Sequence, residues 1–355
     1  MEPLTRKGLV DRPGALGVLL FLLVGGGLTA QQVASVSETP SSASLPFAET
    51  PNYLADEIDA YESFMMSGGP PPDGIPAIDA PRFIDASEAD LDPSEIVIGF
   101  HHQGEARAYP QLIMVHHEIV NDQVGGLNVA ITYCPLTATA QGFKRGDTTL
   151  GVSGQLLNSN VVMFDRETES FFSQITATGI RGEHRGRTLD EVNVYWTTWE
   201  RWLAAFPETQ VLSERTGHLR NYSRDPYGSY APLGGYYQED RTIFPLMHSS
   251  NRHHAKTMVV GGRTESGSAY FVLDELRDEE VQTTESFRGV YDPVLDTGYL
   301  YRADHDLGEI SPMGDGIYEV DGQAYAAGEL PLEKVIPVEA FFFAWHAFYP
   351  DSERP

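Results

Sequence analysis

The sequence predicts a mainly β fold of the α+β class, built as an antiparallel meander of hairpins with a few helices. Three consecutive pairs of apolar or β-branched segments flank residues that suit tight turns. The composition, 41% hydrophobic and 11% aromatic, provides enough side chains for a sizeable core. The predicted hairpins are residues 119–124 with 128–133 around Gly125-Gly126, 143–144 with 148–153 around Gly146-Asp147, and 160–165 with 170–175 around Glu167-Thr168.

The other elements follow from local signals along the chain. Residues 95–100 are a short apolar run typical of a strand, and Pro110 suits the start of a helix over 111–117. Thr197 and Glu200 have capping-box spacing, which predicts a helix that ends before Pro207. Later strands are predicted at 257–260, 269–273, 298–301 and 317–320, and the Phe- and Trp-rich segment 338–348 is predicted to be a buried helix or strand that closes the core.

Two distant segments of the sequence resemble each other. Residues 96–99, followed by 105–109, have the same pattern as residues 258–261, followed by 267–270. The similarity indicates either an internal duplication or two ordinary hairpins of the same length.

The N-terminus has the pattern of an export signal. Arg6, Lys7 and Arg12 accompany an apolar stretch, 14–30, which is short for a membrane span of about 20 residues. We therefore expect a signal peptide over 1–30 and a periplasmic or secreted protein. An uncleaved membrane anchor is the alternative.

The rest of the chain divides by composition. Residues 31–72 are rich in Ser, Thr and Pro and are expected to form a linker. A single domain is expected over 73–352, or alternatively two β-rich halves, 73–180 and 181–352.

Charge and cysteine content exclude several classes of function. The formal net charge of −27 repels phosphate backbones and anionic lipid, so we expect no nucleic-acid partner. The chain has a single cysteine, Cys134, so it cannot form an intramolecular disulfide. An exported protein with one cysteine carries either a free thiol or a metal-bound one.

Cys134 lies at the predicted end of a strand, directly before Pro135, where sheet rims often expose side chains. Thr137 follows three residues after Cys134, so the motif is a Cys-x-x-Cys redox motif with a hydroxyl in place of the second thiol. A hydroxyl can hydrogen-bond a thiolate and lower its pKa, which would make the cysteine reactive. The alternative is a small buried apolar residue.

Histidines form the second group of candidates. The hairpin that follows His116-His117-Glu118 could bring His117 to Cys134 as a base or an ion-pair partner. Neighbouring residues point in different directions, so His116 and His117 are not expected to bind one metal ion unaided. A histidine bonded within the fold is the alternative for His117. His101-His102 and His253-His254 are further pairs, none with the helical spacing of a zinc protease.

Together these motifs resemble the family of domain of unknown function 3179, over roughly residues 74–352. The resemblance implies an exported or envelope protein with no established reaction and with redox chemistry at the family's cysteine sites. Many members resemble Cys-Pro-Leu-Cys where this chain has Cys134 and Thr137, so a dithiol cycle within the motif is impossible here. His117 is the residue that matches the family's histidine. The matching segments are 104–110, 117–122, 125–126, 132–136, 151–154, 158–159, 162–166, Thr168, Ser170, Gln174, 225–227 and 343–345.

Three functions fit these residues, and the sequence leaves open whether the protein is an enzyme. The first is a thiol-dependent redox protein in which Cys134 is the nucleophile, tuned by His117 and Thr137, and forms a sulfenic acid or a mixed disulfide with an envelope partner. The second is a metal module for copper or another thiophilic metal. The third is a non-catalytic ligand-binding module with a cleft lined by Tyr222, Tyr227 and Tyr230. The candidate metal ligands are Cys134, His116, His117, His101 and Met163.

Overall fold

The computed structural model describes residues 45–303 and 308–355. Within them the chain is mainly β, with five short helices and sheets that are antiparallel apart from one strand pair, so the predicted fold class is confirmed. No helix in the described part of the chain is long and apolar enough to cross a membrane. The expected signal peptide, 1–30, lies outside the described residues.

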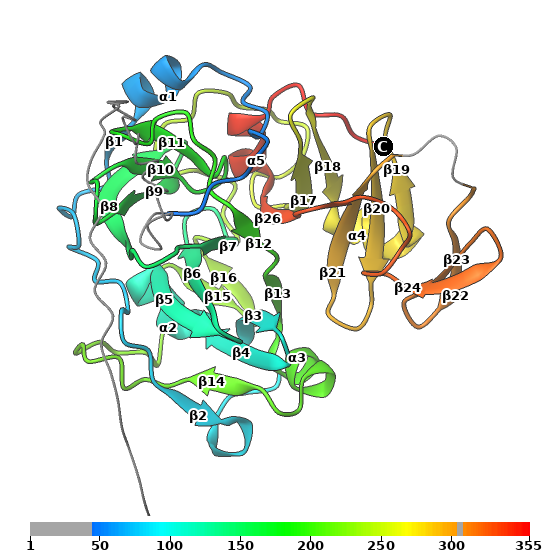
Figure 1. The fold of residues 1–355 in the computed structure, drawn as a ribbon, viewed down its shortest axis with the longest axis horizontal. Helices are drawn as coiled ribbons and strands as arrows, with labels where there is room; N and C mark the ends of the chain where they lie inside the picture. The colour runs from blue at the N-terminus through cyan, green and yellow to red at the C-terminus, as the bar shows by residue number, and fades with distance from the viewer. Residues whose placement is uncertain (1–44, 304–307) are drawn as a thin grey trace, which may run out of the picture. The chain divides into compact units, whose positions relative to one another are not determined.

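Two sheets form the first half of the domain (Figure 1). Their strand orders are β13-β3-β4-β14-β2 and β12-β7-β6-β5, and β14 pairs with β4 in parallel. Helix α2 joins β4 to β5, and α3 follows β13. The bounds are β2 Phe83–Asp85, a 3₁₀ turn Ala86–Glu88, β3 Ile96–His102, β4 Glu105–Pro110, α2 Gln111–His117, β5 Ile119–Val124, β6 Leu127–Cys134, β7 Thr139–Lys144, β12 Glu191–Val192, β13 Tyr195–Thr198, α3 Trp199–Ala205 and β14 Gln210–Leu212.

A five-stranded sheet is inserted between β7 and β12, in the order β1-β8-β9-β10-β11. Its first strand comes from the segment before the domain, where α1 also packs through the fully buried Tyr61. The part of the expected linker that is described, 45–72, is therefore attached to the domain, because its apolar side chains join the core. The bounds are α1 Ile58–Phe64, β1 Met66–Ser67, β8 Leu150–Leu157, β9 Asn160–Asp165, β10 Phe171–Ser173 and β11 Thr178–Arg181.

The second half contains the sheets β18-β17-β26 and β19-β20-β21-β25, with a third sheet, β22-β23-β24, inserted after β21. A two-stranded ribbon, β15-β16, precedes this half. The bounds are β15 Gly228–Tyr230, β16 Leu233–Gly235, β17 Met258–Arg263, β18 Ser268–Val272, α4 Leu273–Glu279, β19 Val281–Thr283, β20 Phe287–Asp292, β21 Thr297–Arg302, β22 Ser311–Gly314, β23 Ile317–Val320, β24 Gln323–Ala326, β25 Lys334–Val335, β26 Val338–Phe341 and α5 Phe342–Phe348.

The predicted hairpins have mixed outcomes. Strands β5 and β6 pair around Gly125-Gly126, which both have positive φ, and β9 pairs with β10 as predicted. The hairpin predicted around Gly146-Asp147 is wrong, since β7 pairs with β6 and β12 whereas β8 pairs with β1 and β9. The chain crosses between two sheets at this point. Arg145 holds the crossing by donating to the carbonyl oxygens of Thr148 and Asp122, at 2.8 and 3.2 Å.

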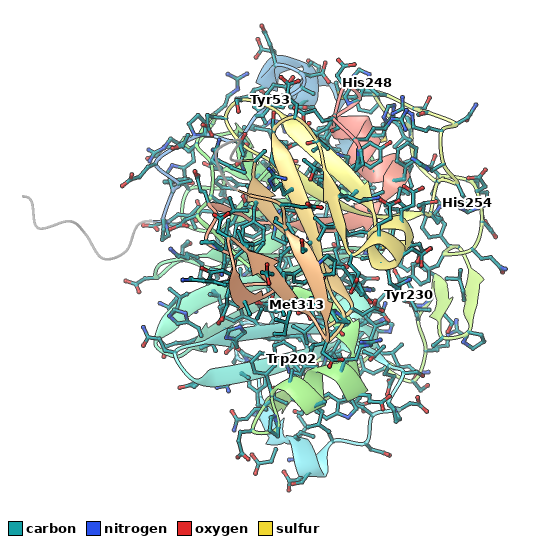
Figure 2. The ribbon with its side chains drawn as sticks, turned by 90° about the vertical axis from the view of Figure 1, so that its right-hand side faces the viewer. Tyr53, Trp202, Tyr230, His248, His254 and Met313 are labelled. Carbon is teal, nitrogen blue, oxygen red and sulfur yellow. The ribbon has the colours of Figure 1, made fainter. Side chains whose placement is uncertain are left out.

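The two halves share one topology, which explains the similarity between residues 96–109 and 258–270. Each runs strand, strand, helix, strand, strand, strand, and ends with a strand and a helix that return to the first strand: β13 with β3, and β26 with β17. In each half a tryptophan of the last helix lies on a glycine of the first strand, so tightly that a Cβ would overlap the ring. The pairs are Trp202 (labelled in Figure 2) on Gly99, and Trp345 on Gly261.

Hydrogen bonds and an ion pair join the two halves. The turn after β6 accepts a hydrogen bond at Thr137 O from Phe341 N, at 2.9 Å, and so rests on the last strand of the second half. Reciprocally, Arg201 on α3 of the first half donates to the carbonyl oxygen of Pro293, in the turn after β20. A buried ion pair, Arg263–Glu191 at 2.8 Å, also joins the halves.

Candidate functional site

Cys134 is the last residue of β6 and precedes a four-residue turn, 135–138, whose final residue, Ala138, has a φ of 50°. Three other hairpins in the described residues have four-residue turns that end on a left-handed residue, namely Glu169, Ala177 and Asp296. Where the first turn has Cys134, these turns have Asp165, Ser173 and Asp292.

The carboxylates at this position stabilise their turns. Asp165 Oδ1 accepts the N–H of Glu167 at 2.9 Å, and Asp292 Oδ1 accepts the N–H of Val294 at 2.8 Å. Cys134 therefore occupies a place where the side chain faces main-chain N–H groups. The N–H of Leu136, in the same turn, accordingly faces the sulfur.

The thiol is enclosed, in contrast to the exposed rim that the sequence suggested. Cys134 is 1% exposed, and its Sγ lies 3.7 Å from the carbonyl oxygen of Ser159, to which the S–H donates. Burial raises the pKa of the Cys134 thiol to about 12, although the Thr137 hydroxyl and the N–H groups of Leu136 and Val161 act in the opposite direction. Desolvation outweighs these donors, so the resting thiol is protonated rather than the lowered-pKa thiolate that Cys-x-x-Thr suggested.

Thr137 lies beside the sulfur and anchors the turn. Its hydroxyl accepts a hydrogen bond from Asn160 Nδ2 at 3.0 Å, and the same amide group donates to Gln174 Oε1 at 2.8 Å. Gln174 in turn donates to the Thr132 hydroxyl at 2.7 Å. This buried network ties the Cys134 turn to the inserted sheet and fixes the position of the turn.

Glu118 is the residue that sequence reasoning missed. It follows α2 in the left-handed conformation, with a φ of 58°, and its main chain is bound by Met114 O and Tyr133 N. Its side chain is only 8% exposed, and its carboxyl has no hydrogen-bond partner within the described residues. Desolvation raises the pKa of Glu118 to about 8, and a charge on Glu118 raises the pKa of Cys134 further.

A cavity of about 290 Å³ gives the Glu118 carboxyl access to a ligand. Apart from Glu118, its walls are mostly apolar, with Tyr227 on one side. Two wall residues, Leu136 and Val161, also direct their N–H groups at the Cys134 sulfur. The remaining lining comes from Gly68, Pro70, Ile75, Val152, Gly154, Gln155, Leu156, Ile243 and Phe244.

His117 faces away from this site. Its Nδ1 lies 2.7 Å from the carbonyl oxygen of Pro76, and its Nε2 lies 2.6 Å from the Tyr222 hydroxyl. Since a carbonyl only accepts, Nδ1 carries the proton, and Nε2 accepts from Tyr222, which in turn is bonded to Thr216 at 2.6 Å. Burial lowers the pKa of His117 to about 4, so the ring is neutral at pH 7. Both ring nitrogens are already used, and neither bonds Cys134.

Comparison with known proteins assigns the family. The model of the family described as "Protein of unknown function (DUF3179)" matches residues 72–352. The chain belongs to this family. No curated protein and no solved structure matches the chain. The expected family is thus confirmed, and its description adds no activity to the DUF3179 domain.

The predicted metal ligands of the DUF3179 domain are dispersed. His116 Nε2 lies 3.3 Å from the carbonyl oxygen of Arg224, His101 stacks on Phe206 at 4.8 Å, and Met163 is buried in the core that includes Cys134. In residues 45–303 and 308–355 no three His, Cys, Asp or Glu side chains gather where they could hold one metal ion. The residues therefore do not fit the expected copper site.

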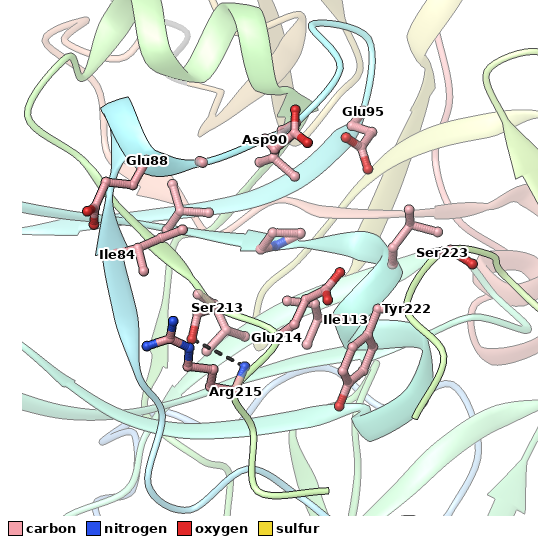
Figure 3. Close-up of a pocket in the computed structure, with 16 residues that line it drawn as sticks. Ile84, Glu88, Asp90, Glu95, Ile113, Ser213, Glu214, Arg215, Tyr222 and Ser223 are labelled. Atoms are coloured by element: carbon pink, nitrogen blue, oxygen red, sulfur yellow. Dashed lines mark hydrogen bonds between the residues drawn. The ribbon is translucent and has the colours of Figure 1, made fainter. Parts of the chain in front are cut away.

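The three tyrosines expected to line one cleft contribute to three separate hollows. Tyr222 lines a cavity of about 860 Å³ with an acidic rim, drawn in Figure 3, and Tyr227 lines the Glu118 cavity. Tyr230 (labelled in Figure 2) lines a third hollow with Gln111 and Asp225, and its hydroxyl lies 3.1 Å from that of Tyr133. Only the Tyr227 hollow contains a buried, unpartnered acid.

Proposed function

We propose that this protein is an exported ligand-binding protein that takes up a small, largely apolar molecule with a polar head in the Glu118 cavity. The observation that carries the proposal is Glu118, which is nine-tenths buried, lines the cavity, and has a carboxyl without a hydrogen-bond partner in the described part of the chain. A buried polar group of this kind costs free energy unless a ligand or water pairs with it. The N-terminal pattern of basic residues followed by residues 14–30 supports export.

The chemistry of the cavity restricts the ligand. The walls offer apolar contacts from Val152, Leu156 and Phe244, which favour a hydrocarbon body. With its pKa near 8, Glu118 is mostly protonated at pH 7 and can both donate and accept a hydrogen bond. An uncharged alcohol or amide head suits it better than an anion.

The test uses 1-hexanol as the probe and follows its binding to the full chain by NMR titration at pH 7. We expect saturable binding with a Kd on the order of 1 mM, as is usual for so small a ligand. Glu118→Ala should weaken binding about tenfold, and Leu156→Trp, which fills the cavity, should abolish it. Glu280→Ala is the matched control, since Glu280 follows α4 with a similar φ of 62° but is only half-buried and lines no part of the cavity. Absence of saturable binding, or undiminished binding by Leu156→Trp, contradicts the proposal.

A second candidate is thiol redox chemistry at Cys134. The observation that favours it is the set of donors around the sulfur: the Leu136 and Val161 N–H groups and the Thr137 hydroxyl. These donors would stabilise a thiolate once the site is hydrated. Hydrogen peroxide would oxidise the thiolate to a sulfenic acid and be reduced to water, and without a second cysteine the sulfenic acid would persist or react with a partner's thiol.

Trapping of the sulfenic acid by dimedone, followed by mass spectrometry, tests this candidate. We expect one adduct on the folded protein and none on Cys134→Ser. An adduct that forms only after denaturation would leave Cys134 as a structural residue and would not affect the ligand-binding proposal.

A further inference from the structure

A second cavity, of about 470 Å³, lies at the place in the second half that corresponds to the Cys134 turn. Asp292, Val294 and Leu295 of the turn after β20 line it, as Leu136 of the turn after β6 lines the Glu118 cavity. In both halves an inserted sheet forms another wall, here through Gly316 and Ile317 of the β22-β23-β24 sheet. The duplicated frame therefore produces two cavities at matching places.

Aromatic rings from both halves form the inner wall. Tyr195 and Phe206 come from the first half and Tyr299 from the second, and the His101 ring stacks on Tyr195 at 5.7 Å and on Phe206 at 4.8 Å. Tyr299 packs against Gly328, where a Cβ would lie 2.7 Å from its ring. Figure 2 labels Trp202 on α3, the helix that precedes Phe206, and Met313 on the inserted sheet, two elements that contribute to the walls.

The polar groups of this cavity are mainly acceptors. Asn193 Oδ1 is buried and has no hydrogen-bond partner in the described part of the chain. Asp292 is 9% exposed, and two exposed residues, Asp315 and Glu329, add further carboxylates to the lining. Lys334, also exposed, is the one lysine or arginine among the lining residues. Burial lowers the pKa of His101, so its ring adds no charge at pH 7.

Carboxylates favour a cation, and aromatic faces also attract a cation. The net charge of the chain, −27, also attracts a cation. Exposed apolar side chains at the mouth, Val294 at 50% and Ile317 at 37%, favour a ligand with an apolar body. We propose that this cavity binds a small protonated amine that carries an aromatic or aliphatic ring.

The experiment compares benzylamine with benzyl alcohol, which has the same ring but no charge, by NMR titration of the full chain at pH 7 and low salt. Binding is followed only on the signals of residues that line this cavity, so that alcohol bound in the Glu118 cavity does not contribute. We expect saturable binding of benzylamine and at least fivefold weaker binding of the alcohol. Asp315→Asn should weaken benzylamine binding about two- to fivefold, the usual range for one exposed ion pair.

Asp321→Asn is the matched control. Asp315 and Asp321 both occupy turns of the same inserted sheet with positive φ, 52° and 50°, and both are exposed, but only Asp315 lines the cavity. Asparagine tolerates this conformation as aspartate does. Equal binding of amine and alcohol, equal effects of the two variants, or no saturable binding would each overturn the proposal. Glu118→Gln should leave benzylamine binding unchanged, which separates this site from the Glu118 cavity.

Discussion

The two halves of the domain have the same frame but carry different residues at the same two places. After the first helix, Glu118 is buried, whereas its counterpart Glu280 is only half-buried. Before the four-residue turn, the first half has the thiol of Cys134, whereas the second has Asp292, which caps its turn. The second half thus serves as an internal control. It shows that the frame forms without a buried acid after the first helix and without a thiol before the four-residue turn.

The inserted sheets add to this difference. The sheet of β8 to β11 covers the Cys134 turn and lines a mostly apolar cavity, whereas the smaller sheet of β22 to β24 lines the cavity beside Asp292, which has several charged residues in its walls. The two similar frames therefore carry cavities of different chemistry. The cavity of the first half contains a neutral acid, and the cavity of the second half contains aromatic rings and carboxylates.

The largest expected effect concerns the tryptophans that both halves share. Trp202→Ala and Trp345→Ala each remove a fully buried ring that lies on a glycine, and each should lower the free energy of unfolding by about 3–5 kcal/mol. Because the Arg263–Glu191 pair and the reciprocal turn contacts join the halves, we expect both variants to shift one common transition in calorimetry. Two transitions, each sensitive to one tryptophan only, would show that the halves unfold independently.

A smaller, pH-dependent effect separates the two glutamates. Glu118 has a raised pKa of about 8 in the folded state against 4.5 ordinarily, so the folded protein retains a proton that the unfolded chain releases. Stability is therefore unaffected below about pH 4.5, falls as the pH rises towards 8, and stays reduced above it. Glu118→Gln removes this loss. The gain in the free energy of unfolding over the unsubstituted protein should therefore be larger at pH 9 than at pH 4.5, by on the order of 3 kcal/mol.

Denaturant unfolding of Glu118→Gln and Glu280→Gln at both pH values measures this difference. The Glu280 variant should change stability little, because its carboxyl already reaches solvent. Some alkaline sensitivity should remain in both, since burial also raises the pKa of Glu339 to about 8. Identical behaviour of the two variants would mean that Glu118 is not desolvated in solution.

The smallest expected effect concerns the last residue of the helix, which is His117 in α2 and the exposed Glu279 in α4. The pKa of His117 is lowered to about 4 from 6.5, so its contribution to stability is present at neutral pH and is lost as the pH falls from about 6.5 to 4. Tyr222→Phe leaves Nε2 without its donor and should cost about 1 kcal/mol at pH 7, and less at pH 4.5.

Thermal unfolding at the two pH values tests this expectation. Tyr325→Phe is the control, because it removes a solvent-exposed hydrogen bond to Gln323 and should be nearly neutral. An equal loss at both pH values would mean that the hydroxyl of Tyr222 stabilises the fold without favouring neutral His117.

Local signals predicted the elements better than their connections. Gly125-Gly126 identified one hairpin correctly because both residues adopt the positive φ that its turn needs. The pairing of β8 with β9 around Asn158-Ser159, which have φ of 53° and 64°, was not among the predicted hairpins, because residues 148–153 were paired with 143–144 instead. At the crossing near Gly146-Asp147, Arg145 donates both to the nearby carbonyl of Thr148 and to that of Asp122 in the preceding hairpin, and no local pattern indicates the second bond.

The same limit applies to the site. Cys134 and Thr137 could be found from their spacing, and the structure brings them together. Glu118 could not be identified as functional, because its burial depends on Tyr227 and on the inserted sheet, which come from later in the chain. His117 is turned towards Pro76 and Tyr222 by α2, a detail that the order of strands does not determine.

The reciprocal contacts of the two turns have a consequence for the origin of the chain. Each turn contacts the terminal strand-and-helix unit of the other half: the turn after β6 is bonded to Phe341 of β26, and the turn after β20 is bonded to Arg201 of α3. Together with the shared topology and the matching tryptophan–glycine pairs, these contacts favour an origin by duplication of a half-length chain whose two copies pack against each other. Duplication lets the two copies diverge, so that one copy carries the thiol of Cys134 where the other carries the turn-capping carboxylate of Asp292, and the whole protein has one sulfhydryl group rather than two.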